Sequence, residues 1–142
     1  MILVDQIRDW LEKDKSVKRV AEDLELTSEL ILLVRMIFAD GEMRAQELSA
    51  FKRICKIAFE IPEDDVPKVL RYLKEYGYET SVTDATAMFK NLDAERKKSL
   101  LLHMLSIAKA DSEVHHGEIE LIRSTAELLG MTPEELTQMQ NT

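Results

Sequence analysis

The sequence contains few of the residues that interrupt helices, and almost no cysteine. Of its 142 residues, four are glycine and three are proline, so long helices meet few breaks. A single cysteine, Cys55, excludes an internal disulfide and favours a reducing compartment. No apolar run approaches the roughly 20 residues of a membrane-spanning helix, and Asp5, Arg8 and Asp9 interrupt the apolar N-terminus before a signal-peptide core can form. We therefore expect a soluble cytoplasmic protein without direct membrane insertion.

Positive charge is also scarce. The sequence has 19 lysine and arginine residues and 27 aspartate and glutamate residues, which gives a formal net charge of −8. A nucleic acid partner requires a basic face, so this balance argues against one. The sequence has no glycine-rich phosphate loop and no recognisable pair of nucleophile and base, so we expect neither an enzyme nor an organic cofactor. Cys55 falls in phase with apolar neighbours, which predicts a buried, inert thiol.

What the sequence does have is apolar residues at helical spacing along nearly its whole length. One-face patterns of the form i, i+3, i+4, i+7 run over residues 30–38 and return in the same phase over 101–108. Further helical patterns cover the N-terminal residues 1–25, 48–58, 69–77, 85–92 and 119–129. No segment alternates with the two-residue period of a strand. The sequence predicts an all-α, single-domain bundle of seven to nine helices over residues 1–142. Arg35 is the one cation within the pattern of the first apolar helix, and we expect a core-facing carboxylate to pair with it.

A short acidic pattern, Ala-Asp-x-Glu-x-x-x-x-Glu, occurs twice. Its acids are Asp40, Glu42 and Glu47 in the first copy and Asp111, Glu113 and Glu118 in the second, a constant offset of 111 − 40 = 71 residues. Self-similarity at a fixed offset indicates a repeated structural unit. We expect repeat 1 over about 29–66 and repeat 2 over about 100–138, related by an approximate two-fold axis. The segment 132–135 (Thr-Pro-Glu-Glu) near the end of the second copy predicts a helix start with a capping box.

The two aspartates of this pattern, Asp40 and Asp111, are expected at the C-terminal ends of helices. The helix dipole is negative there, so an anion costs a few tenths to about 1 kcal/mol. Carboxylates clustered in short turns are ligands for calcium, magnesium or manganese, and His115 beside the second turn would favour zinc or manganese. Glu47 and Glu118 fall in the first turn of the next helix, where a negative charge is also favoured for purely structural reasons. Three interpretations stay open: a divalent metal site, an acidic surface that docks a basic partner segment, or turn formation alone.

These residues resemble the TerB-like family, whose fold is that of the tellurite-resistance protein TerB. The resemblance is carried by the two acidic turns, each between apolar helices, and runs from about Glu29 to Gln138. It implies an all-helical domain with an internal pseudo-two-fold, like that of stand-alone bacterial members. It also implies a metal-associated acidic site formed by Asp40, Glu42, Glu47, Asp111, Glu113 and Glu118, and a role in bacterial stress or tellurite resistance. Ser112 departs from the family pattern, which usually has glycine there, so the two turns are not equivalent.

Elementary electrostatics restricts what such a site can bind. Tellurite is an oxyanion, and a patch of six carboxylates would repel it. Protection against tellurite would then act through a cation, a protein partner or a membrane-associated complex. The sequence therefore predicts a non-enzymatic module that binds a divalent cation, and as the alternative an adaptor whose acidic face docks a basic segment without metal.

Overall fold

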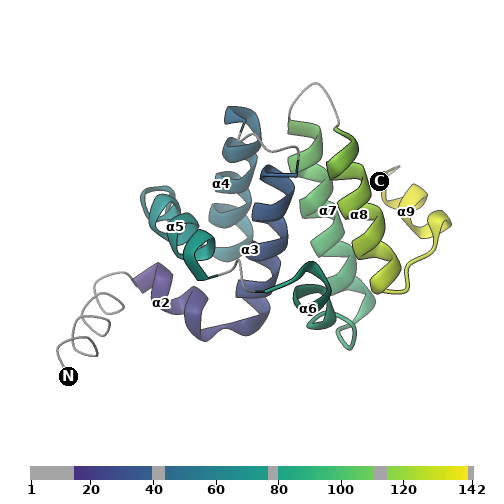
Figure 1. The fold of residues 1–142 in the computed structure, drawn as a ribbon, viewed down its shortest axis with the longest axis horizontal. Coiled ribbons are helices and arrows are strands. Elements are labelled where there is room, and N and C mark those ends of the chain that lie inside the picture. Colours follow the sequence, from purple (N-terminus) through teal and green to yellow (C-terminus); the bar gives the residue numbers. More distant parts are fainter. Residues whose placement is uncertain (1–14, 40–43, 77–79, 111–114, 141–142) are drawn as a thin grey trace.

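Every regular element in the described part of the chain is a helix, which confirms the predicted all-α class. The computed structural model describes residues 15–39, 44–76, 80–110 and 115–140. The elements, shown in Figure 1, are α2 (Lys15–Glu22), α3 (Leu24–Ile37), α4 (Ala45–Phe59), the short 3-10 helix η1 (Glu63–Asp65), α5 (Val66–Tyr76), α6 (Val82–Ala87), α7 (Ala94–Ala110), α8 (His116–Leu128) and α9 (Pro133–Gln140). The helix expected near the start of the chain lies outside the described residues.

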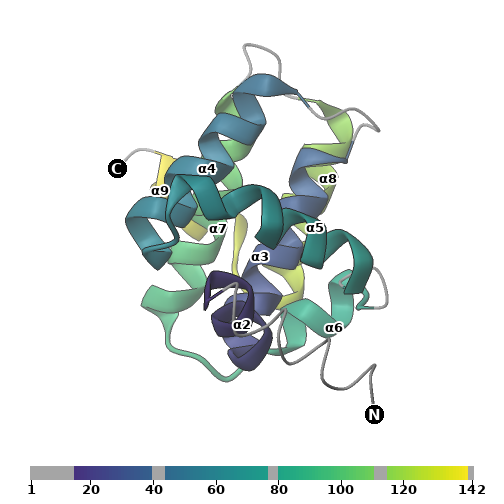
Figure 2. The ribbon, with the colours of Figure 1, turned by 90° about the vertical axis from the view of Figure 1, so that its left-hand side faces the viewer.

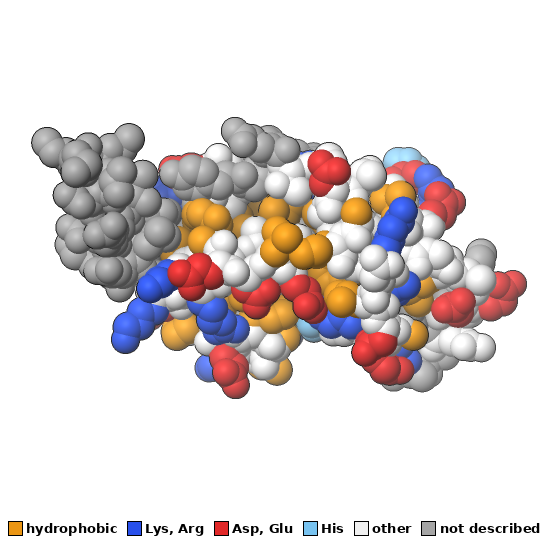
Figure 3. All heavy atoms as spheres, turned by 90° about the horizontal axis from the view of Figure 1, so that it is seen from below, with side chains coloured by type: hydrophobic (Ala, Val, Ile, Leu, Met, Phe, Trp, Pro, Cys, Tyr) orange, Lys and Arg blue, Asp and Glu red, His pale blue; other side chains and the backbone are white. Residues whose placement is uncertain are grey.

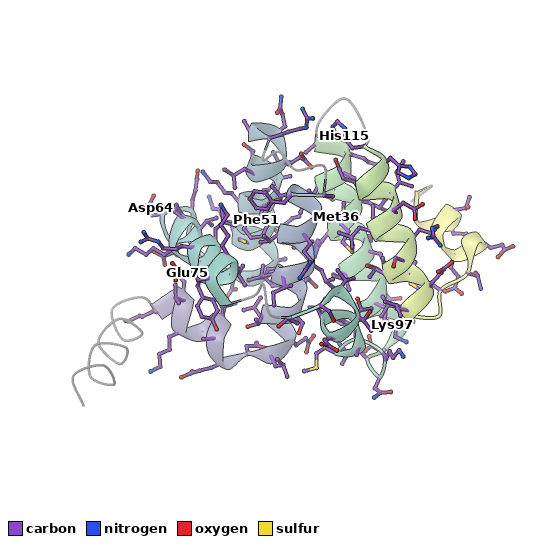
Figure 4. The ribbon with its side chains drawn as sticks, viewed as in Figure 1. Met36, Phe51, Asp64, Glu75, Lys97 and His115 are labelled. Atoms are coloured by element: carbon purple, nitrogen blue, oxygen red, sulfur yellow. The ribbon has the colours of Figure 1, made fainter. Side chains whose placement is uncertain are left out.

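Helices α3 and α7 form the centre of the bundle. Helix α7 packs against α3, α4 and α8, and α3 also contacts α2, α5 and α6. Apolar residues cover most of the circumference of α3, and ten of its 14 residues are buried, so it is enclosed by its neighbours. Met36 of α3 and Phe51 of α4 are completely buried and lie inside the bundle (Figure 4).

Side-chain caps define where several helices begin. The side chain of Asp23 accepts a hydrogen bond from the Leu26 amide at 3.1 Å and caps the start of α3. Leu24 is therefore the first residue of α3, where its side chain is exposed, and it does not belong to α2. The predicted capping box is confirmed. Thr132 Oγ1 accepts a hydrogen bond from the Glu135 amide at 3.2 Å, and Glu135 Oε1 accepts one from the Thr132 amide at 3.4 Å.

One predicted helix has different bounds. The pattern over residues 85–92 predicted a helix there, but α6 spans Val82–Ala87, and turns follow it as far as Leu92. The Ser81 hydroxyl accepts a hydrogen bond from the Asp84 amide at 3.0 Å and fixes the earlier start. Phe89 is nevertheless completely buried, because an apolar residue of a turn can fill the core as well as a helical one.

The helix bounds follow the offset of the sequence repeat. Helix α4 begins at Ala45 and α8 at His116, and 116 − 45 = 71. The C-terminal ends of α3 and α7 and the N-terminal ends of α4 and α8 all lie at the same end of the molecule (Figures 1 and 2). The exact two-fold relation and the single-domain assignment stay predictions. Within the described ranges, none of the helices has the length and hydrophobicity required to cross a bilayer.

Candidate functional site

Two of the six predicted acidic site residues lie in the described part of the chain. Glu47 is the third residue of α4 and Glu118 is the third residue of α8, the positions that the sequence predicted for them. Asp40, Glu42, Asp111 and Glu113 lie outside the described residues. The two glutamates therefore locate the site within the fold.

Both glutamates are buried, which the sequence did not predict. Glu47 is 0% exposed and Glu118 is 1% exposed. An ionised carboxylate that leaves water loses several kcal/mol of hydration, so it must be compensated by hydrogen bonds, an ion pair or a metal ion. The positive end of a helix dipole supplies part of this compensation, because each glutamate lies in a first turn.

The residues just before these helices add positive or titratable groups. Arg44 precedes α4, and its Nε lies 3.9 Å from Glu47 Oε1. His115 holds the equivalent position directly before α8. It lies at the end of the molecule where α8 begins (Figure 4). Arg44 is partly exposed, with 31% of its side chain accessible, so solvent screens its contact with Glu47. The first half thus carries a permanent cation where the second carries an imidazole.

A close backbone contact fixes the start of α8 against the end of α3. A Cβ atom at Gly117 would lie 2.7 Å from the carbonyl oxygen of Ala39, closer than real Cβ atoms come to an oxygen. Glycine is therefore required at 117 for this approach. Ala39 precedes the first acidic turn in the chain, and Gly117 precedes Glu118. The contact brings parts of both acidic motifs, far apart in sequence, to the same place.

A second charged group, between α3 and α7, was not predicted as a unit. Glu29 is 0% exposed and accepts hydrogen bonds from Arg96 Nη1 at 2.5 Å and from His103 Nδ1 at 2.8 Å. Arg96 Nε also donates to Glu25 Oε1 at 2.6 Å. Burial alone would lower the pKa of Arg96, but the two carboxylates outweigh it and raise this pKa above its usual value. The guanidinium thus compensates the negative charge of both carboxylates.

Within the described ranges, Arg35 does not pair with the carboxylate that the sequence predicted. Its Nη2 donates to the carbonyl oxygen of Thr80 at 2.7 Å, and its side chain is partly exposed. The completely buried charge of α3 is Glu29. Its spacing of four residues from Leu33 and seven from Met36, both in the core, was the available signal for this burial.

Among the described residues, no three His, Cys, Asp or Glu side chains form a group that could hold a metal ion. Four of the six predicted ligands lie outside the described residues. The end of the molecule opposite the acidic motifs has mixed charge. On its described part, acidic and basic side chains alternate around exposed hydrophobic ones (Figure 3).

Comparisons with known proteins place the fold. A family model described as "Tellurite resistance protein TerB" matches residues 27–141, most of the chain. A crystal structure of a protein of unknown function from Porphyromonas gingivalis W83 is similar, with a TM-score of 0.59 and 24% sequence identity. The match covers 84% of this chain and 95% of that one, and at this identity it shows the fold alone. A search of curated proteins finds no match.

Proposed function

Because the chain belongs to the TerB family of tellurite resistance proteins, we propose that it is a non-enzymatic helical module that binds a divalent cation through its two acidic motifs. Its ligands are drawn from Asp40, Glu42, Glu47, Asp111, Glu113 and Glu118. Carboxylate oxygens are the donors that calcium, magnesium and manganese prefer, and His115 would add a nitrogen suited to zinc or manganese. When bound, the cation supplies positive charge among acids that otherwise repel one another.

The observation that carries this proposal is the burial of Glu47 and Glu118. The alternative is an adaptor whose acidic face docks a basic protein segment. Lysine or arginine from a partner would meet carboxylates at the surface, whereas these two are 0% and 1% exposed. A basic side chain of a partner would have to reach these carboxylates from solvent, whereas an ion can be enclosed within the fold. Burial therefore favours the metal over the adaptor.

Charge restricts how the proposed cellular role can operate. A cluster of carboxylates repels tellurite, which is itself an anion, so direct capture of tellurite is disfavoured. The protein serves bacterial stress or tellurite resistance through its bound cation, in contact with a protein partner or a membrane-associated complex.

Thermal unfolding with and without metal tests the proposal. Chelator-treated protein is titrated with calcium, magnesium, manganese and zinc, one at a time. A ligand that binds the native state alone stabilises it by about 2.7 kcal/mol at a concentration 100 times its Kd. The double variants Asp40→Asn/Asp111→Asn and Glu47→Gln/Glu118→Gln should lose this stabilisation. The control Glu120→Gln/Glu127→Gln, on the exposed face of α8, should keep it.

Two results would reject the metal site. One is the absence of stabilisation by any of the four ions in the wild-type protein. The other is stabilisation that persists in both double variants, which would place the ion elsewhere. Salt-sensitive association with a basic partner that survives chelator and is lost in the Asp40→Asn/Asp111→Asn variant would establish the adaptor instead.

A further inference from the structure

A cleft of about 560 Å³ opens between α3, α5, α6 and α8. Its walls are mainly apolar, and none of the described residues that line it carries a negative charge. The apolar walls include Ile31, Val34, Leu73 and Leu121. Two cationic side chains, Arg35 and Lys74, also line the cleft. The volume is that of typical small-molecule pockets, which span about 300–1,000 Å³. Neither Glu47 nor Glu118, the two predicted acids that the structure describes, lines it.

Helical spacing builds the longest wall of the cleft. Ile31, Val34, Arg35 and Phe38 follow i, i+3, i+4, i+7 and share one face of α3. On the opposite side, Leu121 follows one turn after Gly117 on α8, and glycine leaves that position without a side chain. The cleft is therefore built mainly on regular helices, with Phe38 and Ala39 just beyond the end of α3.

In the part of the chain that the structure describes, both cations of the cleft contact neutral groups. Arg35 Nη2 donates to the Thr80 carbonyl oxygen at 2.7 Å, and Lys74 Nζ lies 4.8 Å from the centre of the Phe38 ring. A carbonyl and an aromatic ring orient a cation without cancelling its charge. Two positive charges thus line an apolar cleft in a protein whose net charge is −8. This combination suits a ligand with one anionic group and a hydrocarbon chain.

We propose that the cleft binds a free carboxylate amphiphile, such as a medium-chain fatty acid. Its carboxylate lies between Arg35 and Lys74, where a guanidinium can donate two parallel hydrogen bonds to its oxygens. Its chain lies along Ile31 and Val34 of α3 and meets Leu121 of α8. Of the two acidic motifs, only Ala39 and Gly117 line the cleft, so the carboxylate site between Arg35 and Lys74 uses none of the described acidic side chains.

Titration with three ligands of equal chain length tests the proposal. Decanoate, decanol and decyltrimethylammonium are added below their micelle concentrations to the metal-free chain, and binding is followed by calorimetry and by amide chemical shifts. We expect saturable binding of decanoate, with shifts centred on α3, α5 and α8. Decanol and the cationic ligand should bind at least ten-fold more weakly. The absence of saturable decanoate binding, or equal binding of all three ligands, overturns the proposal.

Substitutions then locate the carboxylate. Lys74→Gln changes an exposed side chain, so this variant should fold normally and bind decanoate at least five-fold more weakly. Arg35→Gln retains an amide donor for the Thr80 carbonyl oxygen, so it should also fold normally and weaken decanoate binding at least five-fold. The matched control is Arg71→Gln, on the same helix as Lys74 but 80% exposed, which should bind as the wild type does. Equal affinity in all three variants refutes the assignment to this cleft. Binding to anionic phospholipid vesicles in the absence of decanoate binding would also refute it, because the surface would then recognise a membrane and not a free carboxylate.

Discussion

Arg96 of α7 and Glu29 of α3 form an ion pair at 2.5 Å in which the carboxylate is completely buried. The pair joins the two central helices, and the other oxygen of Glu29 accepts a hydrogen bond from His103 Nδ1 at 2.8 Å. A buried pair that fixes one helix against another specifies their register, since any slip would leave a buried charge uncompensated. These residues therefore hold the two halves of the chain in their relative position.

Removal of Arg96 should destabilise the protein strongly. Arg96→Met leaves Glu29 buried without its main cation, and breaking such a pair from one side costs about 3–5 kcal/mol. Urea unfolding followed by circular dichroism measures this loss. The double variant Glu29→Gln/Arg96→Met removes the buried charge as well and should recover part of it.

An exposed pair supplies the control for Arg96. Arg123 lies 2.8 Å from both Glu120 and Glu127, but about half of its side chain is exposed. Solvent screens exposed ion pairs, so Arg123→Gln should change the free energy of unfolding little. Equal losses for Arg96→Met and Arg123→Gln would contradict the role assigned to burial.

Gly117 should be less tolerant of substitution than its counterpart in the first repeat. A methyl group at 117 meets the Ala39 backbone, and displacing packed atoms costs about 1–3 kcal/mol, partly offset by the better helix propensity of alanine. The equivalent position 71 residues earlier is Gln46, which is exposed. Gln46→Ala should therefore leave the melting temperature nearly unchanged while Gly117→Ala lowers it. A Gly117→Ala protein as stable as the wild type would show that α8 can shift freely against residue 39.

The capping box predicts a smaller local effect. Thr132→Ala removes the hydroxyl that accepts from the Glu135 amide, which should cost about 1 kcal/mol, whereas Thr132→Ser keeps it. Amide hydrogen exchange at the start of α9 measures the loss directly. Faster exchange in the alanine variant alone is the expected result, and equal exchange in both variants would contradict it.

Features that depend on neighbours within one helical turn were predicted well from the sequence. The capping box at Thr132, the third-residue positions of Glu47 and Glu118 and the buried Cys55 all follow from local spacing and are confirmed. The constant offset of 71 residues also matched the starts of α4 and α8.

Features that depend on distant partners were not predicted. Glu29 and Arg96 are 67 residues apart, and nothing in either neighbourhood indicates the other. Arg35 was assigned to the core because its helix is apolar, but it lies where α3 borders the cleft. Burial of Glu47 and Glu118 likewise depends on how four helix ends pack together. Packing between elements, not the elements themselves, was the missing information.

The thiol of Cys55 should react slowly in the folded protein. Burial, with a smaller contribution from the Glu29 carboxylate, raises its pKa from 9.0 to about 12. The reactive form of cysteine is the thiolate, which is therefore almost absent at pH 8. Ellman's reagent should modify the native protein far more slowly than protein unfolded in urea. Equal rates would mean that Cys55 is exposed by frequent local opening.

The same shift in pKa predicts a loss of stability at high pH. The folded state keeps the thiol protonated up to about pH 12, whereas the unfolded chain releases this proton above pH 9.0. A raised folded-state pKa contributes stability that is fully present below the unfolded value and is lost as pH rises toward the folded value. By pH 10 the loss from this one group should reach about 1 kcal/mol. Comparison with Cys55→Ala separates the effect of this thiol from the ionisation of lysine and tyrosine. Between pH 8 and pH 10 the unfolding free energy of the wild type should fall by about 1 kcal/mol more than that of the variant. Parallel curves of unfolding free energy against pH for the two proteins would show that the thiol is not buried from solvent.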